Sequence, residues 1–144
     1  MGQRAGAAAT IRGAFKYGRQ VTVDELRPID LVICGSVAVN RGGARVGKGG
    51  GYSDLEYALA FAAGKLSRDT PILTTVHALQ FIEGAIPREV HDIPVDYIVT
   101  PQEVIETHTS LPRPEGIYWK LLQPEKMEAI PALRKMAAHL PDLA

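Results

Sequence analysis

Three short, mostly apolar runs constrain the fold of this chain more than any other feature. They cover residues 29–34, 71–76 and 95–100, and each is rich in β-branched side chains. Apolar runs of this length, without regular alternation of polar residues, are typical of strands buried on both faces of a parallel sheet. Helical patterns lie between and after them. We therefore predict an α/β fold in which helices cover a mostly parallel sheet.

The segment after the first strand carries two local signals. Asn40 to Gly43 have the composition of a turn, which predicts a small hairpin. Ser53 and Glu56 have the spacing of a capping box, which predicts that a helix begins there. Apolar residues recur at three- and four-residue intervals from Leu55 onward, so this helix has one stripe that can pack on the sheet.

The remaining segments give weaker patterns. Residues 77–81 predict a short helix or loop, residues 100–103 the start of another helix, and residues 117–119 a short edge strand. A closing amphipathic helix, bent at Pro131, is predicted from its apolar positions, which are Met127, Ile130, Leu133, Met136 and Leu140.

A glycine-rich segment lies directly before the first predicted helix. Gly47, Gly49, Gly50 and Gly51 fill four of five consecutive positions, with Lys48 between the first two. Glycines allow backbone N–H groups to converge, and a loop that runs into a helix N-terminus favours a bound anion. The spacing matches neither the Walker sequence nor the dinucleotide fingerprint, and the alternative is a flexible hairpin connection. We favour a phosphate site, to which Arg45 and Lys48 add positive charge.

Three carboxylates are candidates for binding a metal ion. Asp54 is expected in the first helical turn beside the glycines, where it either stabilises the helix dipole or holds Mg²⁺. Asp92 and Asp96 come just before and just inside the third strand. A carboxylate in an apolar strand is costly to bury without a partner, so we expect Asp96 to meet a cation, a backbone donor or solvent.

Composition limits the kind of protein. The 144 residues suffice for one sizeable core, and 16 basic residues balance 16 acidic ones, so no overall field favours nucleic acid or anionic lipid. No apolar run approaches the ~20 residues that cross a bilayer, and we expect a cytoplasmic protein. The lone Cys34 is predicted to be a buried core residue. Residues 1–23 are expected to be a flexible or truncated segment, with the domain at 24–144.

The order of these motifs resembles the 5-formyltetrahydrofolate cyclo-ligase family, also called methenyltetrahydrofolate synthetases. Residues 29–32, 35–40 and 45–52, with Asp54, resemble the family's strand, turn and ATP loop. Gln80 and residues 91–100 resemble its later motifs. The resemblance therefore extends from residue 24 to residue 105, in the central part of the chain.

The resemblance implies a three-layer α/β/α fold with a Rossmann-like sheet and a folate-like substrate. It implies that ATP and Mg²⁺ drive the closure of 5-formyltetrahydrofolate to 5,10-methenyltetrahydrofolate: ATP phosphorylates the formyl oxygen, the neighbouring nitrogen attacks the activated carbon, and phosphate departs. Such a reaction asks the protein mainly for positioning and charge neutralisation. The ATP-binding residues implied are Arg45, Gly47, Lys48, Gly49, Gly50, Gly51 and Tyr52, and the metal ligands are Asp54, Asp92 and Asp96.

Two departures from the family pattern widen the functional alternatives. Family members usually have paired tyrosines followed by Asp-Arg, whereas residues 52–55 here are Tyr-Ser-Asp-Leu. They also usually have a preceding segment with a basic helix, which this sequence lacks. The chain resembles a divergent branch, so its function is a cyclo-ligase, an ATP-dependent enzyme acting on another heterocycle, or a non-catalytic nucleotide-binding or interaction module. The sequence leaves a homo-oligomer open.

Overall fold

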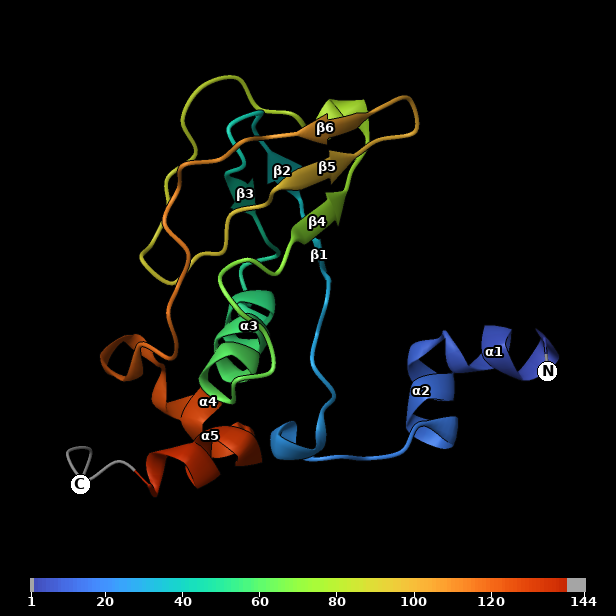
Figure 1. Ribbon diagram of the computed structural model, residues 1–144, viewed down its shortest axis with the longest axis vertical. Coiled ribbons are helices and arrows are strands. Elements are labelled where there is room, and N and C mark those ends of the chain that lie inside the picture. The colour runs from blue at the N-terminus through green and yellow to red at the C-terminus, as the bar shows by residue number, and fades with distance from the viewer. Residues whose placement is uncertain (1, 140–144) are drawn as a thin grey trace.

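The computed structural model describes residues 2–139 and has a mixed α/β architecture (Figure 1). Its main sheet has four strands in the order β1 (Val32–Gly35), β4 (Ile72–Thr75), β5 (Tyr97–Val99) and β6 (Val104–Glu106). The first three strands are parallel, and β6 runs antiparallel to β5. The prediction of an α/β fold with a mostly parallel sheet is therefore confirmed.

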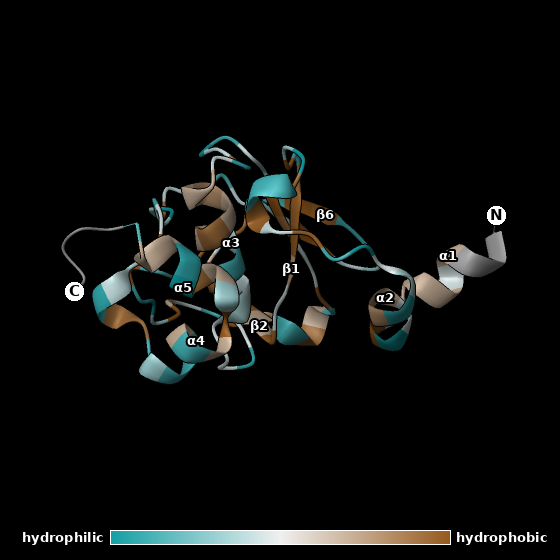
Figure 2. Cartoon of the chain, turned by 90° about the horizontal axis from the view of Figure 1, so that it is seen from below, coloured by the Kyte–Doolittle hydropathy of each residue, from teal (hydrophilic) through white to brown (hydrophobic). Residues whose placement is uncertain are grey.

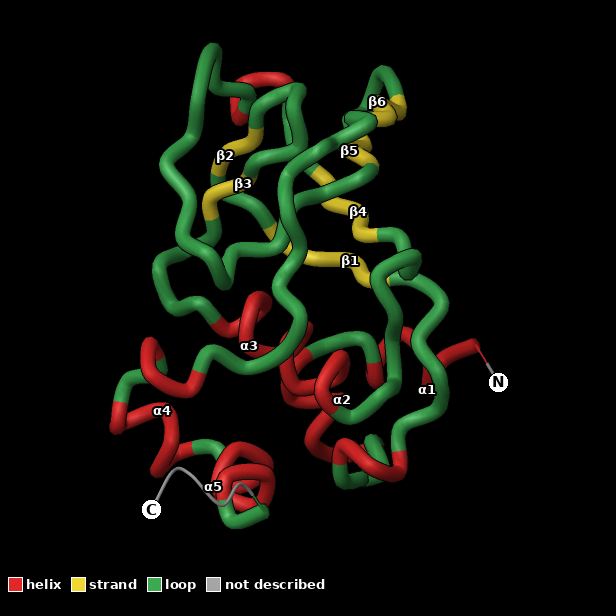
Figure 3. The backbone as a smooth tube through the Cα atoms, turned by 60° about the vertical axis from the view of Figure 1, so that its left-hand side comes forward, coloured by secondary structure: helices red, strands yellow, loops and turns green. Residues whose placement is uncertain are grey.

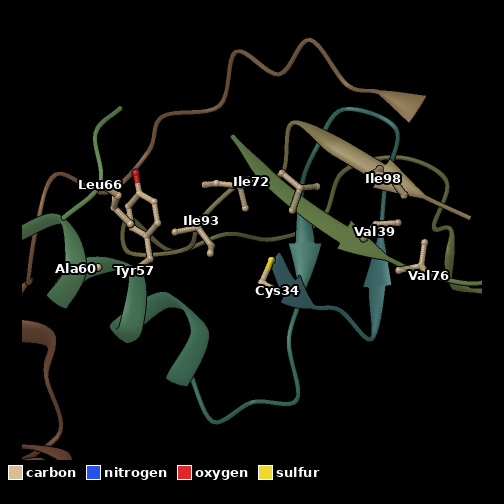
Figure 4. Packing of buried hydrophobic residues seen from close by; sticks show 10 residues of the cluster. Cys34, Val39, Tyr57, Ala60, Leu66, Ile72, Val76, Ile93 and Ile98 are labelled. Carbon is tan, nitrogen blue, oxygen red and sulfur yellow. The ribbon is translucent and has the colours of Figure 1, made fainter. Parts of the chain in front are cut away.

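One face of this sheet forms the core (Figure 4). The register places Cys34 beside Thr74 and Thr74 beside Ile98, and all three side chains are buried. The Thr74 hydroxyl donates a hydrogen bond to the Cys34 carbonyl at 2.8 Å, so this buried polar group is satisfied.

The predicted hairpin is present as β2 (Ala38–Val39) and β3 (Arg45–Val46). Its turn is stabilised by Asn40, whose side-chain oxygen accepts a hydrogen bond from the Ala44 N–H at 3.0 Å. Gly43 has a φ of 86°, and a Cβ there would lie 2.7 Å from the Val95 carbonyl oxygen. Only glycine therefore fits where the hairpin meets the chain before β5.

Helix α3 (Tyr52–Ala62) lies between the sheet and the C-terminal helices (Figure 1). Tyr57 and Ala60 on one side of α3 belong to the same buried cluster as Ile72. Leu55 and Leu59, on another side, pack with Leu133 of the C-terminal helices, which are α4 (Pro124–Ala129) and α5 (Pro131–Ala137). A helix with two buried sides fixes the position of the loop that precedes it.

Three local predictions after β5 are wrong. The Thr100 hydroxyl accepts hydrogen bonds from the amides of Gln102 and Glu103 in a tight turn that leads into β6, so no helix begins there. The edge strand predicted at 117–119 does not form. Residues 117 and 118 belong to no helix or strand, and a 3₁₀ helix, η3 (Trp119–Leu121), begins after them. The closing helix is two helices, because Ile130 is extended and Pro131 starts α5. Leu140 lies outside the described residues.

The chain ends and connections lie around this core. The short helices α1 (Gly2–Ala8) and α2 (Ile11–Tyr17) project from one end of the molecule (Figure 2), followed by η1 (Val23–Glu25). The predicted short element at 77–81 is present as η2 (Ala78–Gln80). After β6 the chain runs without helix or strand along the side of the molecule before it enters η3 (Figure 3). Within residues 2–139, no helix has the length and hydropathy needed to cross a membrane.

The other face of the sheet is more open. Ile33 and Val104 point to this face, and their side chains are 66% and 67% exposed. The neighbouring Leu73, Tyr97 and Val99 are half-buried. The two faces of this sheet therefore differ strongly in burial, although parallel strands usually have both faces covered.

Candidate functional site

The glycine-rich segment connects β3 to α3, and its backbone conformation requires glycine. Gly49 and Gly51 have φ angles of 88° and 61°, in the left-handed region that other residues rarely adopt. Gly51 is the N-cap of α3 and makes no side-chain capping bond. The helix begins at Tyr52, so the predicted capping box of Ser53 and Glu56 is wrong, because Ser53 already lies inside the first turn.

The first turn of α3 presents backbone donors. The first helical hydrogen bond runs from the Leu55 N–H to the Gly51 carbonyl at 3.1 Å, so the amides of residues 52–54 precede the helical ladder. Because Gly51 supplies no cap, these amides and the positive end of the helix dipole favour an anion at this position.

A buried ion pair joins the two ends of the glycine loop. The Arg45 guanidinium, in β3, pairs with the Asp54 carboxylate in α3, and the two side chains are only 3% and 10% exposed. Asp54 also accepts a hydrogen bond from the Ile93 N–H at 3.0 Å, and Arg45 donates one to the Gly35 carbonyl at 3.3 Å. The pair fixes where the loop starts and where it ends.

Arg45 retains an unused donor beneath this loop. Its Nε atom is buried and has no hydrogen-bond partner among the described residues. The guanidinium lies against Gly47, where an added Cβ would be 3.3 Å from Nη1. Arg45 therefore has its charge paired with Asp54 but leaves one donor unused at the loop, while Lys48 and Tyr52 are exposed.

A cavity of about 210 Å³ opens at the N-terminus of α3. Its walls include Gly49, Gly51, Asp54 and His91 on the loop side, and Lys126 on the C-terminal side. Its volume is below the ~300 Å³ at which drug-sized pockets begin, so it fits part of a ligand rather than a whole nucleotide.

The structure does not bring the three predicted metal ligands together. Only Asp54 lies at the glycine loop. Asp92 accepts a hydrogen bond from the Glu89 N–H at 2.7 Å, and Asp96 pairs with Arg113 and accepts from the Ile72 N–H at 2.8 Å. Residues 2–139 contain no cluster of three acidic, histidine or cysteine side chains that could hold a metal.

Cys34 is part of the core, as its sequence context predicts. It is 5% exposed, and burial raises the pKa of its thiol above the ordinary value. A buried thiol with a raised pKa is a poor nucleophile. The structure therefore gives no support to covalent catalysis by this residue.

Two side chains at the site were not among the predicted site residues, although His91 belongs to the segment 91–100 that resembles a family motif. Lys126 comes from α4 and places its Nζ 5.6 Å from the centre of the Tyr52 ring. His91 lines the cavity, and its Nδ1 is buried without a partner among the described residues. Both meet the loop only through tertiary packing, so local spacing in the sequence could not assign them to it.

Comparison with known proteins places this α/β fold and glycine loop in a defined class. The model of the 5-formyltetrahydrofolate cyclo-ligase family matches residues 5–101, which is more than half of the chain. The chain belongs to this family, and the predicted resemblance is confirmed.

The relatives are considerably longer than this chain. The human methenyltetrahydrofolate synthase domain-containing protein is 46% identical over 134 residues, which are 91% of this chain but 34% of that protein. Its bovine counterpart is 44% identical over 89% of this chain and 34% of its own length. The mitochondrial 5-formyltetrahydrofolate cyclo-ligase of Arabidopsis thaliana is 37% identical over 54% of this chain and 29% of its own length. The chain spans about one third of these relatives.

Proposed function

We propose that this chain binds ATP at the glycine loop, and that the site serves the conversion of 5-formyltetrahydrofolate to 5,10-methenyltetrahydrofolate. The observation that carries the proposal is the uncapped start of α3, held open by the buried Arg45–Asp54 pair. Family membership supports ATP as the anion and a folate as the second substrate. Location in the cytoplasm is part of the same proposal.

The residues at the loop fit a polyphosphate. The free amides of residues 52–54 suit phosphate oxygens, and Gly49 and Gly51 leave the approach to the backbone clear of side chains. Arg45 contributes buried charge and an unpaired Nε, and Lys48 contributes a flexible ammonium group. The proposed contacts with the nucleotide are made by Arg45, Gly47, Lys48, Gly49, Gly50, Gly51 and Tyr52.

Magnesium fits this site as an ion carried by the nucleotide. Mg²⁺ in ATP-dependent sites is commonly held by one or two carboxylates together with substrate phosphates. Asp54 is the carboxylate at the loop, and Arg45 and Ile93 both contact its Oδ1 atom, which leaves Oδ2 as the candidate ligand atom. Asp92 and Asp96 are engaged elsewhere, so we do not retain them as ligands.

The chemistry asks the chain for orientation and charge neutralisation. The bound Mg²⁺ would neutralise negative charge on the phosphates of ATP during transfer to the formyl oxygen. The residues of this chain orient the phosphates with α3 amides and balance their charge with Arg45 and Lys48. Ring closure by the neighbouring folate nitrogen, with loss of phosphate, needs no nucleophile from the protein, which is consistent with the buried state of Cys34.

A non-catalytic nucleotide-binding module is the second candidate function. The Tyr-Ser-Asp-Leu run at 52–55 lacks the second tyrosine and the arginine of the usual family pattern. Four similar vertebrate proteins are named for a synthase domain rather than for the enzyme itself. In this alternative the chain binds ATP but does not catalyse the conversion of 5-formyltetrahydrofolate.

Calorimetry tests the binding half of the proposal. We expect ATP to bind more tightly with Mg²⁺ than without it, and Lys48→Ala to weaken binding about tenfold, because one charge-assisted contact is lost. Lys120→Ala is the matched control, since Lys120 is also exposed but lies in η3. An unmodified chain that fails to bind ATP with or without Mg²⁺ overturns the proposed site.

Turnover separates the enzyme from the module. The methenyl product absorbs in the near ultraviolet, so its formation can be followed with 5-formyltetrahydrofolate, ATP and Mg²⁺ supplied together. We expect weak turnover by residues 1–144, because the aromatic and the cation of the family pattern are absent, and binding energy from the whole substrate is needed to orient reacting atoms. Binding of ATP with no turnover, even by a longer form of the protein, favours the module.

A further inference from the structure

The side chain of Lys126 reaches the glycine loop from a distant part of the sequence. Its Nζ lies 5.6 Å from the centre of the Tyr52 ring, and a Cβ built on Gly51 would be only 3.1 Å from it. Packing of α4 and α5 against Leu55 and Leu59 of α3 brings the two regions together. An ammonium group thus stands directly over the first turn of α3.

This position is electrostatically unfavourable for a cation in the unliganded chain. The N-terminus of a helix carries partial positive charge, and anions rather than cations are stabilised there. Within residues 2–139, no carboxylate lies within salt-bridge distance of Lys126, although other lysines and arginines of the chain make such pairs. The nearby Asp54 carboxylate is engaged at Oδ1 by Arg45 and by the Ile93 amide, and Lys126 makes no salt bridge with it. The Tyr52 ring is itself exposed and supplies only a weak attraction for the ammonium group.

The cavity beside Lys126 has room for an anion. Lys126, Gly49, Gly51 and Asp54 line the same space of about 210 Å³. A phosphate group in it would face the α3 amides on one side and the ammonium on the other. Two positive elements that repel each other across an empty space would then both be stabilised by one ligand.

We propose that Lys126 is a phosphate-binding residue, which closes the polyphosphate site from the α4 side and makes affinity depend on the number of phosphates. This inference rests on the proposed ATP function, and it adds a residue outside the segment that the family model matches, which ends at residue 101. The loop residues bind from below and from the flank. Lys126 binds from above, so its contribution grows with the charge and reach of the phosphate chain.

Calorimetry with inorganic tripolyphosphate, ATP, ADP and AMP tests the proposal. For the unmodified chain we expect affinity to rise with the number of phosphates. Lys126→Met should weaken ATP and tripolyphosphate about tenfold, the effect of losing one charge-assisted contact, and should weaken AMP much less. Lys126→Arg should retain most of the affinity, because it retains the charge. Lys120→Met, on exposed η3, is the matched control and should bind like the unmodified chain.

Thermal unfolding without ligand provides a readout that separates binding from packing. Removing a cation from the positive end of α3 should leave the melting temperature of Lys126→Met unchanged or slightly higher. A clear fall in melting temperature together with unchanged ATP affinity shows that Lys126 is a packing residue and overturns the inference. Equal ATP affinity of Lys126→Met and the unmodified chain also overturns it, while leaving the ATP site intact. Absence of binding by the unmodified chain itself overturns the proposed function and this inference together.

Discussion

This domain contains two buried or partly buried arginine–aspartate pairs, Arg113–Asp96 and Arg45–Asp54, and they differ in what surrounds them. Arg113 pairs with Asp96 through both carboxylate oxygens and also donates to the carbonyls of Arg68 and Thr70, each at 2.7 Å. Asp96 accepts a further hydrogen bond from the Ile72 amide. This pair ties the long segment after β6 to the start of β4, and both carboxylate oxygens and both terminal guanidinium nitrogens contact protein groups. The Tyr57 hydroxyl near the pair is buried without a partner among the described residues.

The Arg45–Asp54 pair leaves hydrogen-bonding groups unused beside it. It is more deeply buried than the Arg113 pair, yet Arg45 Nε has no partner and the adjacent amides of α3 have no cap. Buried polar groups are normally satisfied, and exceptions in native structures often mark function. In keeping with the proposed function, we assign the Arg113–Asp96 pair to the fold and the Arg45–Asp54 pair to the candidate ligand site.

The largest expected effect comes from breaking the deeper pair. Asp54→Ala should lower the free energy of unfolding by about 3–5 kcal/mol, because the Arg45 guanidinium stays buried without a counter-charge. Denaturant unfolding followed by circular dichroism measures this.

A double variant provides the control. Arg45→Met with Asp54→Leu removes both charges and should recover most of the lost stability while abolishing ATP binding. If Asp54→Ala alone costs less than about 1 kcal/mol, water reaches the pair, and it does not act as a buried clamp.

Breaking the Arg113–Asp96 pair should cost less. Asp96→Ala should lower the free energy of unfolding by about 1–3 kcal/mol, since the two side chains are 17% and 23% exposed and water can solvate Arg113 once its partner is gone. ATP affinity, measured by calorimetry on the folded fraction, should not change. A tenfold loss of ATP affinity in this variant would connect Asp96 to the site and remove the contrast between the two pairs.

Gly49 in the glycine loop can be compared with Gly64, which lies outside the loop but has a similar left-handed conformation. Gly49 and Gly64 have φ angles of 88° and 66°, and neither has an atom within 4 Å of an added Cβ. Alanine at either position should therefore cost about 1–2 kcal/mol through backbone strain alone. Only Gly49→Ala should weaken ATP binding. Equal ATP affinities for the two variants would show that the conformation of the loop is not needed for the site.

An exposed ion pair should give the smallest effect on stability, against which the effects of the two buried pairs can be compared. Asp24 and Lys135 lie 2.6 Å apart, and their contact lowers the pKa of Asp24 and raises that of Lys135. Because the pKa of Asp24 is lowered, this group stabilises the folded state at any pH above its ordinary pKa of 3.8. The stabilisation is lost as the pH falls from there through the lowered pKa. Because the pKa of Lys135 is raised, this group stabilises the folded state at any pH below its ordinary pKa of 10.5. The stabilisation is lost as the pH rises from there through the raised pKa.

Thermal unfolding across pH tests this exposed pair. Lys135→Met should melt slightly below the unmodified chain at neutral pH, and the difference should vanish in strong acid. A difference that stays constant down to the lowest pH at which the chain folds would assign the effect to packing of the lysine stem instead.

Sequence patterns predicted the features that depend on neighbouring residues. The β-branched runs gave the three parallel strands, and the turn chemistry at Asn40 gave the hairpin. The cost of burying Asp96 predicted that it needs a partner, but only the fold brings Arg113 to it, 17 positions along the chain. The glycine loop was recognisable from the sequence. The ion pair between Arg45 and Asp54 and the position of Lys126 near the loop were not, because both depend on how α3 packs.

The wrong predictions have local physical causes. Thr100 to Glu103 look like a helix start, because a hydroxyl that accepts from amides two and three residues later serves a tight turn equally well. The same ambiguity affected Ser53, which lies two residues too late to cap a helix that starts from a left-handed glycine at position 51. Capping signals identify free amides near a residue but do not decide which structure uses them.

The open face of the sheet also decides how unfolding of this protein can be measured. Environment-sensitive dyes report melting by fluorescing when they meet newly exposed apolar surface. With Ile33 and Val104 already two-thirds accessible, we expect such a dye to bind the folded chain and to raise the fluorescence baseline before the transition. The single tryptophan, Trp119, packs with the α3–α5 cluster beside the candidate site. Its intrinsic emission is therefore the better optical signal for both melting and ligand titration.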